Sequence, residues 1–249
     1  MNRSMVSVPE HGMRVARSFF VGLFVSTTLL AQTDPMAVLD SLLPEVVENG
    51  RVDYAVVARR YKESIDAVLD LSAQIDPAGL REKDRLAFYI NLYNAAMIQA
   101  VLDRGGVDFR PDRDDFKVFK DPLVRLKTGN VSLNDLENNI IRKQFKDPRI
   151  HAALVCGAIS CPPLINKAYR GETLDKQLDE NVKNWLADPK RNIIDDAGRT
   201  LKLSKIFDWY ADDFGGKANV AKWVSEKLGR DVSGYGVEFL EYDWSLNKP

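Results

Sequence analysis

The chain of 249 residues contains only two cysteines and two histidines, and it lacks both a basic block and a repeated segment. The formal net charge of −1 argues against a surface for nucleic acid or for anionic membranes. The absence of a fixed-period repeat or a low-complexity tract argues against a solenoid and against long linkers. We expect neither a metal site nor a cofactor, because the spacing of the cysteines and the histidine matches no common zinc pattern.

The remaining composition is that of an ordinary globular protein, with 45% hydrophobic and 29% charged residues. A chain of this length can bury a full core within one domain. We therefore expect residues 32–249 to form a single compact domain.

The longest apolar run lies near the N-terminus, where Arg14 and Arg17 precede the apolar residues 19–31. This run is short for a membrane span but has the length of the hydrophobic region of a secretory signal. We predict a signal peptide over residues 1–31, with cleavage after Ala31 and a periplasmic or secreted mature protein. Such a protein would have no integral membrane association, whereas the alternative is an uncleaved N-terminal anchor.

Helical spacing of apolar residues alternates along the chain with short extended segments. A hairpin is expected within 191–203 around Asp196-Ala-Gly198, and a last strand over 237–244. A mixture of this kind indicates the α+β class. The expected helices cover residues 34–49, 61–73, 85–104, 133–145, 173–186, a segment that begins at Ser204 and has an aromatic packing face, and 219–228.

The predicted helix over 85–104 is apolar around its whole circumference, which is typical of a buried central helix. Within it, Asn91 and Asn94 lie three residues apart and share one face. A buried amide without a hydrogen-bond partner costs roughly 1–3 kcal/mol, so both side chains need partners. They either join the helix to neighbouring backbone or bind a substrate.

Glu137 falls on the apolar face of the predicted helix 133–145, four residues from both Leu133 and Ile141. Buried carboxylates are rare unless they are paired. Glu137 is therefore expected to face a base or a group of donors in a cleft. The alternative is an ion pair with an arginine such as Arg125 or Arg142.

Both cysteines and His151 lie in the segment 151–164. Cysteine catalysis needs a thiolate, a base that forms it and a group that orients the base. His151 is the only candidate base after residue 31, and Glu137 is the candidate orienting group. The apolar run 150–156 predicts a buried strand, on which Cys156 would point away from His151. We therefore slightly favour Cys161 as the nucleophile, although a bulge at Gly157 could redirect Cys156.

Other functions of the cysteines remain open. A cysteine in an apolar segment is often a small core residue, and two cysteines of an exported protein often form a disulfide. A separation of five residues permits a bridge between Cys156 and Cys161. Zinc binding by His151, both cysteines and Glu137 ranks third, because the spacing matches no common zinc pattern.

Several segments between about residues 80 and 215 resemble family 547 of the domains of unknown function, which occurs in bacteria and plants. The resemblance implies an architecture similar to papain-like and transglutaminase-like cysteine enzymes, with a buried central helix packed on an antiparallel sheet and extra helices. It also implies Cys-His-Glu hydrolysis of a small thiol peptide such as glutathione. One departure is Asn138, where many relatives have histidine after the family glutamate. The segments are 89–96, 136–142, 151–164, 169–180 and 203–214.

Two hypotheses of function follow. The first is an exported cysteine hydrolase acting on a peptide-like or thiol-peptide amide, with Cys161 or Cys156 as nucleophile, His151 as base and Glu137 orienting it. Asn91 or Asn94 would bind the substrate. The second is a non-catalytic exported binding or structural module with a Cys156–Cys161 disulfide.

Overall fold

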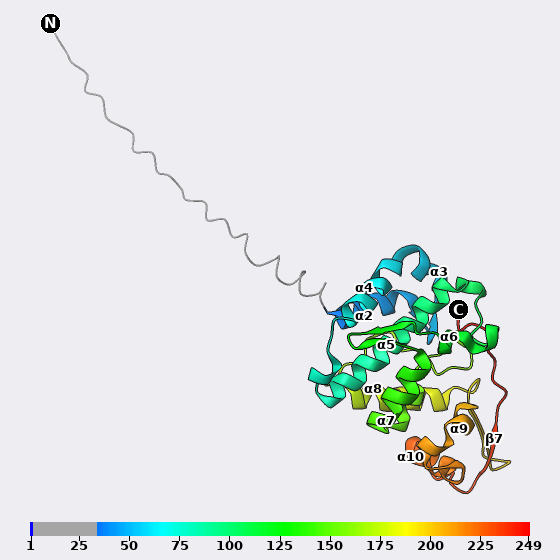
Figure 1. Ribbon diagram of the computed structural model, residues 1–249. Coiled ribbons are helices and arrows are strands. Elements are labelled where there is room, and N and C mark those ends of the chain that lie inside the picture. The colour runs from blue at the N-terminus through cyan, green and yellow to red at the C-terminus, as the bar shows by residue number, and fades with distance from the viewer. Residues whose placement is uncertain (2–33) are drawn as a thin grey trace.

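The computed structural model describes Met1 and residues 34–249 (Figure 1). The predicted signal peptide and its cleavage site lie outside the described residues, apart from Met1. Within the described part of the chain, no helix is both long enough and apolar enough to cross a membrane.

Helices dominate the described residues, and the predicted helical segments are confirmed, except that the predicted helix 34–49 ends at Val46 and residues 47–48 form a strand. Asp34 begins the first of these helices, because its carboxylate accepts a hydrogen bond from the Met36 amide at 2.9 Å. The α-helices are α2 (Pro35–Val46), α3 (Tyr54–Val56), α4 (Lys62–Ser72), α5 (Glu82–Asp103), α6 (Lys117–Lys120), α7 (Arg142–Phe145), α8 (Leu174–Ala187), α9 (Ile206–Trp209) and α10 (Val220–Leu228).

Shorter helical turns of other types connect these helices. Two are π-helical, namely η1 (Val57–Tyr61) and η5 (Asp135–Ile141), and η5 continues directly into α7. The 3₁₀ turns are η2 (Pro77–Gly79), η3 (Gly106–Asp108), η4 (Arg113–Phe116), η6 (Pro148–Ala152), η7 (Ala211–Phe214) and η8 (Lys217–Asn219).

The strands are short and form three small sheets. Two are antiparallel pairs, β1 (Val47–Glu48) with β2 (Arg51–Val52) and β3 (Val124–Leu126) with β4 (Gly129–Val131). In the third sheet, β5 (Ile193–Asp195) and β6 (Thr200–Leu203) form the predicted hairpin. The last strand, β7 (Gly236–Phe239), pairs with β6 in parallel.

The α+β class is confirmed, but the surroundings of the central helix differ from the expectation. Helix α5 is buried from Leu86 to Ile98 and again at Ala100 and Val101, and it packs against α4, η5 and the strand β3. An α-helix of 22 residues is about 33 Å long, whereas a strand of three residues spans only about 10 Å. Strands of that length cannot cover the helix, and the three-stranded sheet belongs instead to a second hydrophobic cluster with α8 and α10. In Figure 1, α2 and α4 lie at one end of the molecule and α9 and α10 at the other.

The predicted strand over 150–156 is wrong. Residues 148–152 form η6, in which Asp147 accepts a hydrogen bond from the Arg149 amide at 2.9 Å and Pro148 occupies the first helical position. The following residues have no regular structure. A short apolar run cannot by itself distinguish a strand from a buried helical turn, and here the Asp-Pro start favoured the turn.

Candidate functional site

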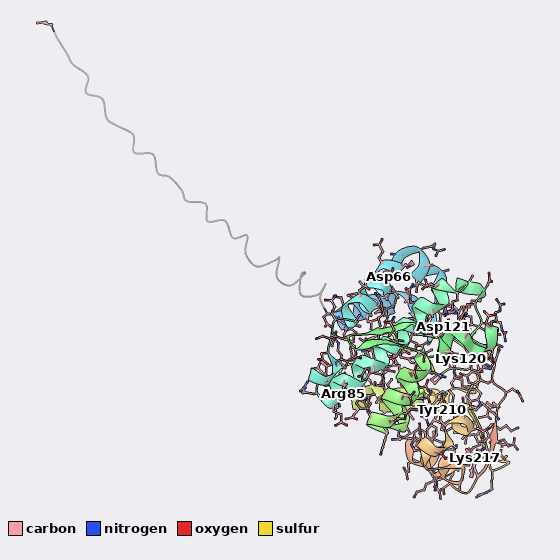
Figure 2. The ribbon with its side chains drawn as sticks, in the orientation of Figure 1. Asp66, Arg85, Lys120, Asp121, Tyr210 and Lys217 are labelled. Atoms are coloured by element: carbon pink, nitrogen blue, oxygen red, sulfur yellow. A yellow bond between two sulfur atoms is a disulfide. The ribbon has the colours of Figure 1, made fainter. Side chains whose placement is uncertain are left out.

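A pocket of about 410 Å³ contains three of the predicted site residues, Glu137 from η5, His151 from η6 and Cys156 from the loop after η6. Lys120 of α6 and Tyr210, which follows α9, also line it and are labelled in Figure 2. The rest of the lining is mostly aromatic and consists of Tyr93, Phe116, Phe119, Asn134, Leu154, Ile206, Trp209, Tyr242 and Trp244.

His151 is held in one orientation by its neighbours. Its side chain is 1% exposed, and its Nε2 atom lies 2.7 Å from Oδ2 of Asp213. The ring of Tyr210 stacks on the imidazole with a centroid distance of 4.2 Å. Because Nε2 is engaged by Asp213, the nitrogen that remains for proton transfer is Nδ1.

Asp213 lies in η7 and is also bound by Arg142. The guanidinium donates from Nε to Oδ2 at 2.6 Å and from its second terminal nitrogen to Oδ1 at 2.8 Å. Burial alone would raise the pKa of Asp213, but the hydrogen bonds from His151 and Arg142 outweigh it and hold the pKa well below its usual range. Asp213 is therefore a carboxylate that positions His151, the arrangement found in nucleophile–His–Asp triads.

The sequence reasoning assigned that position to Glu137 and missed Asp213. The two residues bonded to each other, His151 and Asp213, are 62 positions apart. A signal for Asp213 was present in the segment 203–214, which carries part of the family resemblance.

Glu137 is 8% exposed and faces the pocket. Neither arginine considered as its partner pairs with it among the described residues, because Arg125 pairs with Asp70 and Arg142 with Asp213. The groups beside its carboxylate are instead the hydroxyls of Tyr93 and Tyr210. Burial raises the pKa of Tyr93 and of Tyr210, and the negative charge of Glu137 raises both further.

Cys156 and Cys161 form a disulfide across five residues. Cys156 is half-buried and lines the pocket, with its Sγ atom 3.1 Å from the Tyr242 hydroxyl. Cys161 is 1% exposed, and its Sγ accepts hydrogen bonds from the amides of Cys156 and Ala158 at 3.1 and 3.2 Å. The pocket thus contains Cys156, whereas the sequence reasoning favoured Cys161 from a strand alternation that does not exist.

The C-terminal segment holds the disulfide loop in place. The amide of Ile159 donates to the Ser245 carbonyl at 2.6 Å, and the amide of Asn247 donates to the Gly157 carbonyl at 2.9 Å. These bonds bring Tyr242 and Trp244 to the pocket from the end of the chain. The sequence offered no signal for this, because the contacts are made by backbone groups.

Asn91 and Asn94 lie outside this pocket and bond to backbone. Asn91 donates to the Tyr169 carbonyl at 2.8 Å and accepts from the Tyr169 amide at 2.9 Å. Asn94 donates to the Ala153 carbonyl and accepts from the Val155 amide, both at 2.9 Å. Each amide therefore joins α5 to a loop, and Asn94 fixes the segment between His151 and Cys156.

An aromatic wall, defined here as Phe116, Trp209, Tyr242 and Trp244, forms part of the pocket lining. Its rings pack in sequence, with centroid distances of 4.8 Å from Trp209 to Tyr242, 4.5 Å from Tyr242 to Trp244 and 4.9 Å from Trp244 to Phe116. Trp209 is 46% exposed, so the aromatic residues around α9 do not all serve the core.

The described residues contain no group of three or more histidine, cysteine, aspartate or glutamate side chains arranged to hold a metal ion. They do place a histidine held by Asp213, a cysteine sulfur atom and the buried carboxylate of Glu137 in one aromatic pocket. This is an α+β protein with a His-Asp pair beside a disulfide.

Residues 77–186 match the model of a family described as "Protein of unknown function, DUF547". The match covers α5, η5, His151 and both cysteines, and it supports the family resemblance of the chain. Asp213 and the aromatic residues Trp209, Tyr242 and Trp244 lie outside the matched range. No curated protein and no solved structure matches the chain significantly.

Proposed function

We propose that this protein is an exported cysteine hydrolase of a peptide-like or small thiol-peptide amide, and that it is active when the Cys156–Cys161 disulfide is reduced. The observation that carries the proposal is the common pocket of Cys156 and His151, with His151 held by Asp213. A pocket of this size suits a small peptide.

The disulfide must open before Cys156 can act as a nucleophile. Two molecules of a small thiol reduce the bridge to two cysteine thiols and leave as their own disulfide, so electrons and protons balance. A thiol peptide such as glutathione could supply this reductant itself. The attacking thiolate would reach Cys156 first, because Cys156 is half-buried whereas Cys161 is 1% exposed.

In the reduced protein, Nδ1 of His151 takes the Cys156 proton, and Sγ attacks the amide carbonyl carbon. The amine leaves with that proton, and a thioester remains on Cys156. Water then attacks the thioester with His151 as the base, which releases the acid and restores the thiol. The Tyr242 hydroxyl, 3.1 Å from Sγ, is close enough to donate to the carbonyl oxygen during the attack. Asp213 stabilises the protonated imidazole but does not touch the substrate.

Iodoacetamide labelling of the reduced protein near neutral pH, followed by mass mapping, tests the activated thiol. We expect Cys156 to react faster than the thiol of an unstructured peptide, and His151→Ala to remove that difference. Hydrolysis of glutathione and of short peptide amides is then measured for the wild type and Cys156→Ser. A Cys156 that reacts no faster than the free peptide contradicts the proposal.

Export is part of the same proposal and rests on the apolar residues 19–31 that follow Arg14 and Arg17. Expression of the full chain in a bacterial host and N-terminal sequencing of the mature protein test it. A mature protein that begins near residue 32 and is recovered from the periplasm supports export. An intact N-terminus in the cytosolic fraction contradicts it.

A second candidate is a non-catalytic binding module in which the disulfide is purely structural. The buried Cys161, whose sulfur accepts two backbone hydrogen bonds, favours this function. Mass spectrometry without reductant distinguishes the two. A fully oxidised pair that mild reductant leaves unchanged favours the binding module, since no nucleophile is then formed.

A further inference from the structure

The Glu137 carboxylate has no cationic partner among the described residues, although its side chain is nine-tenths buried in the pocket. Arg142 and Lys120 both bind other carboxylates. The hydrogen bonds to Asp213 raise the pKa of Arg142 most, and the charge of Glu137, which is close enough to act on it, raises that pKa further. Arg142 donates to both oxygens of Asp213 and to Asn138 at 2.7 Å. Lys120 pairs with Asp115 at 2.6 Å, and both of these side chains are more than half exposed. A buried carboxylate costs free energy unless a cation or several donors compensate for it, and here the hydroxyls of Tyr93 and Tyr210 supply donors but no cation pairs with it among the described residues.

The rings around Glu137 are suited to the rest of a cationic ligand. Tyr93 and Tyr210 lie beside the carboxylate. Because the Tyr210 ring already packs against His151 and Arg142, the rings left for a ligand are those of the aromatic wall from Trp209 to Phe116. The face of an aromatic ring attracts a cation within about 6 Å of its centroid, and tryptophan does so most strongly. The same faces cover the apolar stem of a ligand.

We propose that this pocket binds a primary ammonium group on an apolar or aromatic stem. The ammonium group would donate to Glu137, and the stem would lie against Trp209 and its neighbours. The inference deepens the proposed function, on which it rests for the identification of the pocket as a substrate site. It specifies an amide substrate that carries a free amino group, and it assigns Glu137 to ligand recognition and not to the orientation of His151.

Calorimetry on the oxidised protein tests the inference without any reaction, because neither disulfide-bonded cysteine can attack. The probes are 2-phenylethylamine, its neutral analogue 2-phenylethanol, and phenylacetate as an anion of similar size. We expect the amine to bind about tenfold or more tightly than the alcohol, and phenylacetate to bind more weakly than both.

Glu137→Gln should abolish the preference for the amine over the alcohol, because the amide keeps the shape but not the charge. Glu63→Gln, which removes an exposed carboxylate on α4, is the matched control and should retain the preference. If Glu137→Gln does not fold, Trp209→Leu serves instead, since Trp209 is 46% exposed. Trp209→Leu should lower the affinity for the amine several-fold.

Equal binding of amine and alcohol, tighter binding of phenylacetate, no binding of any probe, or an unchanged preference in Glu137→Gln overturns the inference. These results are separate from those for hydrolysis. Amine binding without hydrolysis of any amide overturns the proposed function alone, whereas hydrolysis of neutral amides without an amine preference overturns this inference alone.

Discussion

The imidazole of His151 and the carboxylate of Asp213, 2.7 Å apart, connect η6 to η7 across 62 residues of sequence. Arg142, the first residue of α7, donates to both oxygens of the same carboxylate, so α7, η6 and η7 meet at one charged group. The orientation of His151 toward the pocket therefore depends on a residue outside the segment that matches the family model.

Asp213→Asn should lower the alkylation rate of reduced Cys156 by at least about tenfold, because an amide cannot stabilise a protonated imidazole. Glu137→Gln should lower that rate much less, since Glu137 does not bond to His151. Alkylation rates of both variants beside the wild type and His151→Ala distinguish the two carboxylates. A larger loss in Glu137→Gln than in Asp213→Asn would show that Glu137 orients the base.

The lowered pKa of Asp213 predicts a dependence of stability on pH. Because the folded state holds the carboxylate ionised below the ordinary aspartate pKa of about 3.9, its contribution is complete at neutral pH. The contribution should decline as the pH falls through that value and toward the folded-state pKa. Urea unfolding from pH 7 to pH 3 should thus show the wild type converging toward Asp213→Asn. Asp66→Asn, at an exposed ion pair with Lys62, is the control and should stay close to the wild type throughout. A gap between wild type and Asp213→Asn that widens in acid would contradict the pKa direction.

After reduction, Cys156 should be alkylated before Cys161, because Cys156 lines the pocket and Cys161 is 1% exposed. Cys161→Ser should leave a free Cys156 thiol that reacts without any reductant. Loss of the bridge should cost about 2 kcal/mol of stability, the loop-closure term for a loop of this length. Mass mapping over time and urea unfolding measure the two effects. Faster labelling of Cys161 would instead indicate that Cys161, which the sequence favoured, is the nucleophile.

Gly157→Ala should destabilise the protein by about 1–3 kcal/mol. Gly157 has a φ of +80°, and a Cβ atom there would lie 2.9 Å from the Met97 side chain. Gly79→Ala is a suitable control, because no atom lies within 4 Å of its added Cβ and its φ is not positive. In thermal melts, Gly157→Ala should have a clearly lower melting temperature than Gly79→Ala. Equal melting temperatures would mean that the loop after Cys156 adjusts freely.

Asn94→Ala should cost about 1–3 kcal/mol, because the Val155 amide and the Ala153 carbonyl would lose their partner. Asn166→Ala, at an exposed position, should have little effect. Asn94 does not line the pocket, so Asn94→Ala should lower the affinity for amine probes only through the loss of stability around the pocket. If Asn94→Ala keeps its stability but no longer binds or hydrolyses a substrate, Asn94 contacts the substrate after all.

The helices were predictable because their signals are local. Capping residues such as Asp34, and apolar spacing such as that of 85–104, need only neighbouring residues to take effect. The hairpin of β5 and β6 was predictable for the same reason. The segment 150–156 was not, because a short apolar run is compatible with a strand and with the helical turn that Asp147 and Pro148 begin.

The sequence by itself determined the chemical groups of the site, since His151 is the only histidine after residue 31 and the two cysteines lie close enough to pair. It also identified Glu137 and Asn94 as buried polar residues that need partners. The tertiary structure pairs Asn94 with backbone groups, whereas Glu137 has no cationic partner among the described residues. Only the tertiary structure decided that Asp213 binds His151, that Cys156 faces the pocket, and that Tyr242 and Trp244 complete its wall. The physical reason is that these contacts join residues far apart in the chain through packing and backbone hydrogen bonds, for which no local pattern of residues exists.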